Sequence, residues 1–284
     1  MALDNLNVTK NIPSDQKLWR YMKPDRLIQI LENQQLYFTS LTKYESSDPF
    51  EGIFPKTVLY KLGEIIQTIK KSRSESSELI EKYIFQKYPS MPMNLQEEIR
   101  EKVAQINNMY EPMEDLVFKI IKSSVVNCWH QNDFESEAMW RLYANKGVAI
   151  QTTVENLVHS IDDQRVFFSE VKYIDFDDQN LTISDCLHQK GLNPLLKRLQ
   201  FKHEQEARLY FCPTRNYLDK HLKEQGECIA VDTARLISKI YISPYLAEST
   251  ANKLRRKIKK LGIKDEDIIS SRLLKIDENL RSLY

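Results

Sequence analysis

Apolar residues in this chain occur in short β-rich runs in some segments and at helical spacing in others. The change between the two patterns marks the boundaries between predicted strands and helices. Residues 18–22 and 36–40 are short β-rich runs. Between them Leu27, Ile28 and Leu31 share one face of a helix, which Pro24 is suited to open because proline fits the first helical turn. The pattern predicts a strand, a helix and a second strand, followed by an irregular segment over residues 42–55.

Helical spacing dominates the next part of the chain, from residue 57 to about residue 122. Apolar side chains repeat at helical intervals from Val58 to Ile69 and again from Leu95 to Ile106. A serine-rich run at residues 72–77 predicts a break between two helices. We expect a helical insertion here that carries no chemistry.

Strand-like runs return after the insertion. Strands are expected at residues 125–129, 148–152, 166–174, 207–211, 228–231 and 240–243, helices at 137–145, 193–201 and 245–261, and either element at 268–276. Strands at both ends with helices gathered between them indicate the α+β class rather than alternating βαβ units. We therefore expect one α+β domain over residues 1–284, with a mixed or antiparallel central sheet and the helical insertion at about 57–122.

Composition narrows the classes of function. The 40 acidic and 41 basic residues nearly cancel, so net charge does not attract the chain to nucleic acid or membrane. No apolar run reaches the roughly 20 residues of a spanning helix, and the alternation at residues 3–10 argues against a cleavable signal. The four scattered cysteines form no C-x-x-C pair, which predicts free thiols and a cytoplasmic protein. Glycine-rich phosphate loops are also missing, which argues against Rossmann and P-loop folds.

A dense charged motif precedes the predicted strand at residues 207–211. Glu204, Glu206 and Arg208 are two positions apart, and alternate residues of a strand share a face. Three charges on one face are costly to bury unless they pair with each other or with a ligand. The motif fits either a solvated face on which Arg208 bridges the acids, or a functional site.

A second charged motif, residues 47–51, opens a metal alternative. Its Asp48 and Glu51 could join Glu204 and Glu206 in binding a hard cation such as Mg²⁺, as in metal-dependent nucleases. Such nucleases often keep a lysine two positions beyond a strand acid, and here that place after Glu206 holds an arginine. The metal site stays an alternative.

Aromatic and basic clusters allow two interpretations each. Trp140 and Tyr143 share a helix face and either pack in the core or wall a pocket for a planar ligand. His130 is a possible general base without a sequence-adjacent partner. The basic run at 253–260 fits a solvated helix face or a surface that follows phosphates.

Five short motifs follow one another in a recognisable order. They are LWRY at 18–21, LYFTS at 36–40, SDPFEG at 47–52, MWRLYA at 139–144 and EQEAR at 204–208. Together they resemble a widespread bacterial family of domains of unknown function, over residues 18 to about 245. The relatives of that family include abortive-infection proteins, so the resemblance implies a bacterial defence- or toxin-type effector. Ser47 and Ala207 depart from the family's usual asparagine and aromatic residue.

The opening strand and helix, with the later E-x-E motif, are also similar to ADP-ribosyltransferase-like folds. That similarity implies NAD as cofactor, with Arg20 on its pyrophosphate or ribose, Tyr37 or Ser40 at the nicotinamide, and Glu206, assisted by Glu204, as the key carboxylate. A carboxylate there would offset the positive charge of an oxocarbenium-like transition state. Further candidate binding residues are Asp48, Glu51, Trp140, Tyr143 and Arg208.

The sequence leaves three functions open. The leading expectation is ADP-ribosyl transfer or NAD cleavage, with an unknown protein or nucleic acid as acceptor and no membrane partner. The alternatives are a magnesium-dependent nuclease and a non-enzymatic sensor or binding protein in which the charged motifs form a structural network. Assembly into a homo-oligomer is open under each of them.

Overall fold

A branched, mostly antiparallel sheet organises the computed structural model, which describes residues 7–8, 12–44, 46–108, 123–186, 195–212 and 226–275. Its central strand is β4 (Val125–Gln131), and β9 (Glu206–Phe211) pairs along one edge of it. Two strands share the other edge, β2 (Lys17–Met22) toward one end and β3 (Gln35–Ser40) toward the other. The sheet therefore branches where β2 and β3 diverge along β4.

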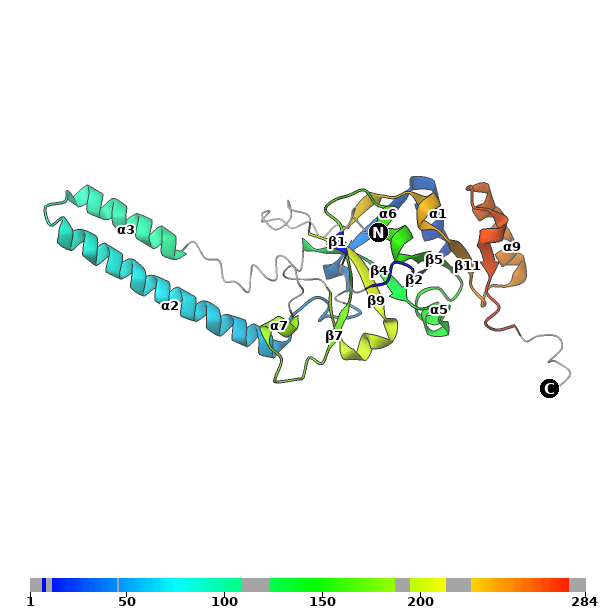
Figure 1. The fold of residues 1–284 in the computed structure, drawn as a ribbon, viewed down its shortest axis with the longest axis horizontal. Coiled ribbons are helices and arrows are strands. Elements are labelled where there is room, and N and C mark those ends of the chain that lie inside the picture. Colours follow the sequence, from blue (N-terminus) through cyan, green and yellow to red (C-terminus); the bar gives the residue numbers. More distant parts are fainter. Residues whose placement is uncertain are drawn as a thin grey trace.

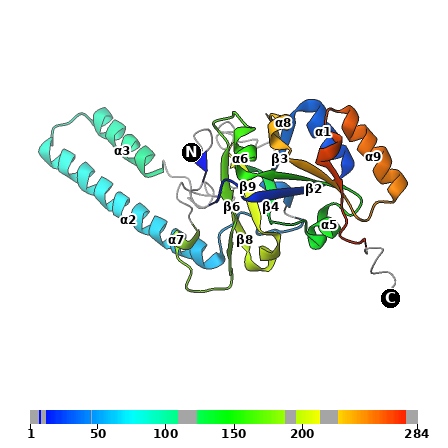
Figure 2. The ribbon, with the colours of Figure 1, turned by 45° about the vertical axis from the view of Figure 1, so that its right-hand side comes forward.

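The sheet extends in both directions from this branch (Figures 1 and 2). β5 (Val148–Thr153), β11 (Lys239–Ile242) and β12 (Ile268–Ser270) continue it beyond β2, whereas β6 (Phe167–Glu170) and β1 (Asn7–Val8) continue it beyond β9. β10 (Glu227–Ala230) pairs with β3, and β7 (Lys172–Ile174) with β8 (Leu196–Arg198) forms a separate parallel pair. The mixed, largely antiparallel arrangement confirms the expected α+β class.

Helices cover one face of the sheet with the largest apolar core. Leu27 of α1 (Pro24–Asn33), Leu157 of α6 (Val154–His159), Leu236 of α8 (Thr233–Leu236) and Ile258 of α9 (Glu248–Lys260) are fully buried there. On the opposite face α5 (Glu137–Tyr143) buries Met139 and Trp140 against Trp19 and Tyr21 of β2. Alternation along β2 thus directs Leu18 and Trp19 into different cores.

The segment expected to be a helical insertion forms two helices that project from the sheet (Figure 1). They are α2 (Lys56–Lys87) and α3 (Met93–Asn108), which pack against each other. The expected break at residues 72–77 is wrong, because α2 runs through the serines without interruption. Serine lowers helix stability only modestly, and residues on both sides continue the helix. Residues 109–122 lie outside the described chain.

Two further expectations are corrected. The helix expected at residues 193–201 is instead strand β8 followed by the 3₁₀ helix η2 (Leu199–Glu204), with residues 193–194 outside the described chain. The strand interpretation holds for the described start of the run at 268–276, as β12. Among the described helices, none combines the length and the apolar character needed to cross a membrane.

Candidate functional site

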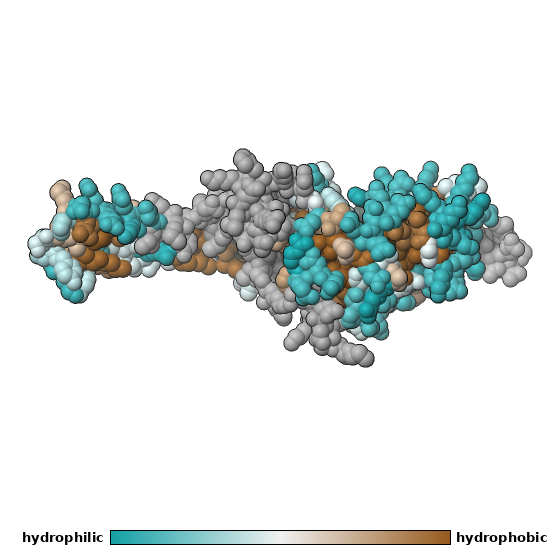
Figure 3. All heavy atoms as spheres, turned by 90° about the horizontal axis from the view of Figure 1, so that it is seen from above, coloured by the Kyte–Doolittle hydropathy of each residue, from teal (hydrophilic) through white to brown (hydrophobic). Residues whose placement is uncertain are grey.

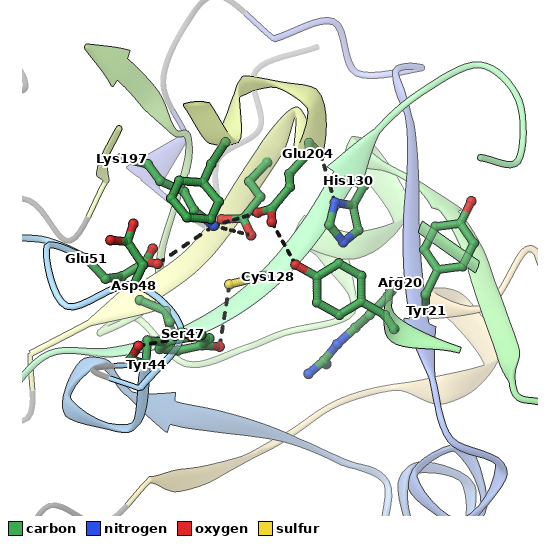
Figure 4. A pocket seen from close by; sticks show the side chains of 14 residues that line it. Arg20, Tyr21, Tyr44, Ser47, Asp48, Glu51, Cys128, His130, Lys197 and Glu204 are labelled. Atoms are coloured by element: carbon green, nitrogen blue, oxygen red, sulfur yellow. Dashed lines mark hydrogen bonds and ion pairs between the residues drawn. The ribbon is translucent and has the colours of Figure 1, made fainter. Parts of the chain in front are cut away.

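A pocket of about 250 Å³ lies on the face of the sheet that carries Glu206, beside the branch between β2 and β3. We call it the carboxylate pocket (Figure 4). Its lining comes from distant parts of the sequence: Arg20, Tyr21, Tyr44, Ser47, Asp48, Glu51, Val126, Cys128, His130, Tyr143, Lys197, Phe201, Glu204 and Glu206. The two charged motifs of the sequence therefore meet in one pocket.

Two different local conformations bring the E-x-E motif to this pocket. Glu206 and Arg208 alternate in β9 and share a face, as the sequence predicts. Glu204 does not belong to the strand, because it ends η2 and Gln205 then adopts the left-handed conformation with φ of 45°. The turn at Gln205 still returns the Glu204 carboxylate to the cluster.

Lys197 lies at the centre of the carboxylates. Its Nζ is 2.5 Å from Glu204 Oε2, 3.4 Å from Glu206 Oε1 and 3.7 Å from Glu51 Oε2. The lysine is 5% exposed, so these acids replace most of the water around its ammonium group. β8 places it there, since Gly52 N donates to Leu196 O and holds the Asp48–Glu51 turn beside this strand.

Arg208 supports the same cluster from beneath. Its Nε donates to Glu206 Oε2 at 2.8 Å, and its Nη2 pairs with both Glu206 and Glu51. The guanidinium is 1% exposed and does not line the pocket. Three carboxylates, Glu51, Glu204 and Glu206, thus face two cations, so the ionised cluster carries one excess negative charge.

Burial and the neighbouring charges shift the pKa values of the two E-x-E acids in opposite directions. Burial alone would raise the pKa of Glu206, but the positive charges of Arg208 and Lys197 outweigh it and lower this pKa to about 2. For Glu204 burial raises the pKa, and the negative charge of Glu206 raises it further. Lys197 shows the reciprocal effect, because Glu206 and Glu51 overcome its burial and raise its pKa. Of the two E-x-E acids, Glu206 is therefore the one whose charged form the surroundings favour.

Asp48 forms a separate ion pair at the rim of the cluster. Its Oδ1 lies 2.9 Å from Arg198 Nη2 and accepts a hydrogen bond from Phe50 N at 3.1 Å. Its Oδ2 is buried with no hydrogen-bond partner among the residues that the structure describes. An unpartnered buried acceptor is costly, so this oxygen is suited to a donor from a ligand.

Tyr143 and His130 form the wall opposite Lys197. The Tyr143 hydroxyl donates to Glu204 Oε1 at 2.9 Å, and its ring lies 5.4 Å from the His130 ring. His130 Nδ1 is 2.8 Å from the carbonyl oxygen of Glu204. Because a carbonyl only accepts, Nδ1 must carry the proton, which leaves Nε2 as an acceptor in the neutral ring. Burial favours the neutral ring, since it lowers the pKa of His130.

Cys128 lies at the branch of the sheet and contributes a protonated thiol. Its Sγ is 3.8 Å from the Tyr44 hydroxyl. Burial and the charge of Glu206 raise the pKa of this thiol to about 12. A thiol with so high a pKa is a poor nucleophile at neutral pH, so Cys128 serves as a neutral wall.

Arg20 reaches the pocket from the other side of the sheet. Trp19 pairs with His130, and His130 pairs with Glu206, so these three side chains lie on one face of the sheet. Arg20 follows Trp19 in β2, and its side chain therefore points to the opposite face. The open branch lets its guanidinium border the pocket all the same, directed away from the carboxylates (Figure 4). Its Nη1 is buried and has no hydrogen-bond partner within the described chain.

The remaining candidates from the sequence lie in different surroundings. Trp140 is fully buried in the core under α5, and its indole donates to Glu135, so it packs rather than walling a pocket. Ser40 is buried and bonded to Thr42. Tyr37 lines a neighbouring pocket. Sequence reasoning missed Lys197, which lies within a run assigned to a helix, and no signal in the sequence marks this lysine as a neighbour of the acids.

A metal site requires carboxylates whose oxygens are available to bind a cation. The four acids do line one pocket, as that alternative requires, but Lys197 stands between three of them. Within the described residues no group of three or more His, Cys, Asp or Glu side chains is placed to hold a metal ion.

Comparison with known proteins finds one family model, which matches part of the chain around this site. No curated protein and no solved structure matches the chain. One family model does match, in agreement with the resemblance inferred from the motifs. The matched region includes the motifs at 139–144 and 204–208, but not Arg20, Asp48 or Glu51. Over residues 139–209, which supply Tyr143, Lys197, Glu204 and Glu206, the chain matches the model of a family described as a protein of unknown function, DUF2971.

Proposed function

We propose that the carboxylate pocket binds NAD and cleaves the bond between its nicotinamide and ribose. The observation that carries this proposal is that Arg20 and the pair Glu204 and Glu206 line one pocket, although they come from two distant segments of the chain. The arginine offers an unpartnered donor for an anionic group, and the acids offer negative charge to a reacting sugar.

The excess negative charge of the cluster is the feature suited to this reaction. When the glycosidic bond breaks, its electron pair leaves with nicotinamide, and positive charge develops on the ribose carbon and ring oxygen. A buried cluster with one more carboxylate than cations stabilises that charge without reorganising. Glu206 is the carboxylate best suited to stay ionised, and Lys197 and Arg208 hold it in place.

The second half of the reaction requires a nucleophile. Water, or a group on a protein or nucleic-acid acceptor, attacks the ribose carbon and loses its proton to a base. Nε2 of His130 has a free lone pair in the pocket and can take that proton. Transfer to an acceptor, or depletion of NAD by hydrolysis, would suit a defence- or toxin-type effector.

Nicotinamide release from NAD tests the proposal. The purified protein is incubated with NAD, with and without cell lysate to supply an acceptor, and free nicotinamide is followed by NMR. We expect release by the wild type and none by Glu206→Gln or Glu204→Gln, each checked for folding by circular dichroism. Glu75→Gln, an exposed acid on α2, is the matched control. Release that is equal in all four proteins would contradict the assignment, and no release by the wild type would reject the reaction.

One observation favours the non-enzymatic alternative. Every carboxylate of the cluster has an internal cation partner, as in a network that fixes a fold. Loss of stability in Glu206→Gln cannot separate the two interpretations, because breaking a buried pair is destabilising under both. Tyr143→Phe does separate them, since it removes one hydrogen bond to Glu204 and retains all the charges. An enzyme would lose turnover with little change in melting temperature.

A further inference from the structure

A second pocket adjoins the carboxylate pocket and has the opposite charge. It encloses about 280 Å³ between α1 and the branch of β2 and β3. Arg20, Lys23 and Arg26 line it, together with Tyr37, and no carboxylate is among its described lining residues. We call it the cationic pocket. Three cations without an acid would repel one another, so the pocket favours an anionic ligand.

Arg20 connects the two pockets. It lines both of them, as does Tyr21. Burial lowers the pKa of Arg20, Cys128 and Tyr44 act against this effect, and the nearby charge of Arg26 lowers the pKa further. Its buried Nη1 has no hydrogen-bond partner in the described part of the chain. A ligand oxygen at this point would supply the missing acceptor.

The position of Tyr37 is fixed on two sides. The Arg26 guanidinium lies 5.2 Å from the centre of its ring. At the hydroxyl end Gly226 comes so close that a Cβ there would lie 2.4 Å from the tyrosine hydroxyl. Arg26 also donates to Gln29 Oε1 at 3.3 Å through Nη1, and its other N–H groups remain able to bind a ligand. The pocket therefore presents a planar ring beside a held guanidinium.

We propose that the cationic pocket binds the diphosphate of a nucleotide whose other end occupies the carboxylate pocket. This inference rests on the proposed function for the identity of that other end. Arg20 lies at the junction, Arg26 and Lys23 take the phosphate oxygens, and Tyr37 contacts the adjoining sugar or base. The separation of charge then orients the ligand, because phosphates are repelled from the carboxylates and drawn toward α1.

Calorimetric titration with ADP, pyrophosphate and adenosine tests the site without any turnover. We expect ADP and pyrophosphate to bind the wild type more tightly than adenosine, and to bind more weakly as salt rises. Arg26→Gln should weaken ADP binding about tenfold, since it removes a charge-assisted contact at an exposed position where the fold does not depend on it. Arg256→Gln on α9 is the matched control, because it removes the same charge outside both pockets.

The outcomes separate this inference from the proposed function. No binding of ADP, or equal binding by Arg26→Gln and Arg256→Gln, overturns the cationic pocket. ADP binding that depends on Arg26, without nicotinamide release from NAD, retains the pocket and rejects the reaction. Nicotinamide release whose kcat/KM is unchanged by Arg26→Gln retains the reaction and rejects the pocket.

Discussion

Glu206 stabilises the fold only while its carboxylate is ionised, since its partners Arg208 and Lys197 are cations. A folded pKa of about 2, against an ordinary value of 4.5, corresponds to about 3 kcal/mol at neutral pH. Because the folded pKa is depressed, this stabilisation is complete above the unfolded pKa. It is lost as the pH falls from about 4.5 toward 2.

Glu206→Gln should therefore destabilise the protein strongly at pH 7 and about half as much at pH 3. Carboxylates outside the cluster titrate alike in both proteins, so they cancel in the difference, whereas Glu204 loses the negative charge that helps to raise its pKa. Urea denaturation of the wild type and the variant at the two pH values measures it, and Glu75→Gln should show almost no difference at either. An equal destabilisation at pH 7 and pH 3 would mean that packing, not the charge, is what Glu206 contributes.

His130 offers a second test at the level of one residue. The bond from Nδ1 to the Glu204 carbonyl fixes the tautomer, and burial lowers the pKa although Glu206 acts against it. Glu204, Lys197 and Arg20 are the other charged groups around the ring. Long-range nitrogen-15 NMR should show a neutral ring protonated at Nδ1, titrating below the usual range near 6.5. A ring protonated at Nε2, or one charged at pH 7, would refute the assigned geometry.

Among the elements, α2 shows where the pattern of the sequence is misleading. Ser72, Ser74, Ser76 and Ser77 predict a break, yet they lie inside one helix, and Ser76 donates its hydroxyl to the carbonyl of Ser72. A serine at such a position competes with the helical hydrogen bonds and weakens the helix without ending it. The break was therefore predicted from residues that cost too little to cause one.

Substitutions at Ser76 test this explanation. Ser76→Ala should stabilise α2 by about 0.5 kcal/mol, whereas Ser76→Pro should cost about 3 kcal/mol and reduce the helix content. Thermal melts followed by far-ultraviolet circular dichroism measure both effects. If proline leaves the helical signal unchanged, residues 72–77 form the break that the sequence first suggests.

The end of β2 approaches the chain closely at Gly147, the residue that precedes β5. A Cβ at Gly147 would lie 2.2 Å from the backbone oxygen of Met22 and 2.8 Å from Ala144 Cβ, and backbone cannot yield as a flexible side chain does. Gly147→Ala should destabilise the protein by about 1–3 kcal/mol. Denaturant unfolding measures it, with Gly262→Ala as a comparison in which the added Cβ meets no neighbour but φ is +95°. A neutral Gly147→Ala would show that the two strands can move apart.

For the whole molecule, the sequence predicts the helices and strands better than it predicts which of them pack or pair with each other. Spacing located β2, α1, β3 and β9 because each buries a continuous apolar face, and alternation placed Glu206 with Arg208. It did not reveal that Lys197 enters a strand, because β8 has only three residues and no apolar alternation. It also gave no sign that β2 and β3 share one edge of β4, since the pairing of distant strands is a tertiary property.

An exposed apolar surface distinguishes the projecting helices from the sheet. α2 buries only Val58 and Ser77 among its 32 residues. Large apolar side chains such as Leu79, Ile80 and Tyr83 are more than half exposed, and Figure 3 shows brown side chains along this part. Apolar groups that remain in water contribute little to stability, so α3 and the outer part of α2 should open more easily than the sheet.

Native-state hydrogen exchange in rising denaturant tests this difference in stability within the molecule. β4 pairs with β2, β3 and β9, so its amides should exchange only when the whole fold opens, whereas those of α3 and of α2 beyond Ser77 should exchange through local opening at a lower free energy. Protection of these helices equal to that of β4 would contradict the expectation for a lone chain. If that protection decreased when the protein was diluted, a second copy of the chain would cover the exposed side chains of these helices. The protein would then form a homo-oligomer through this surface.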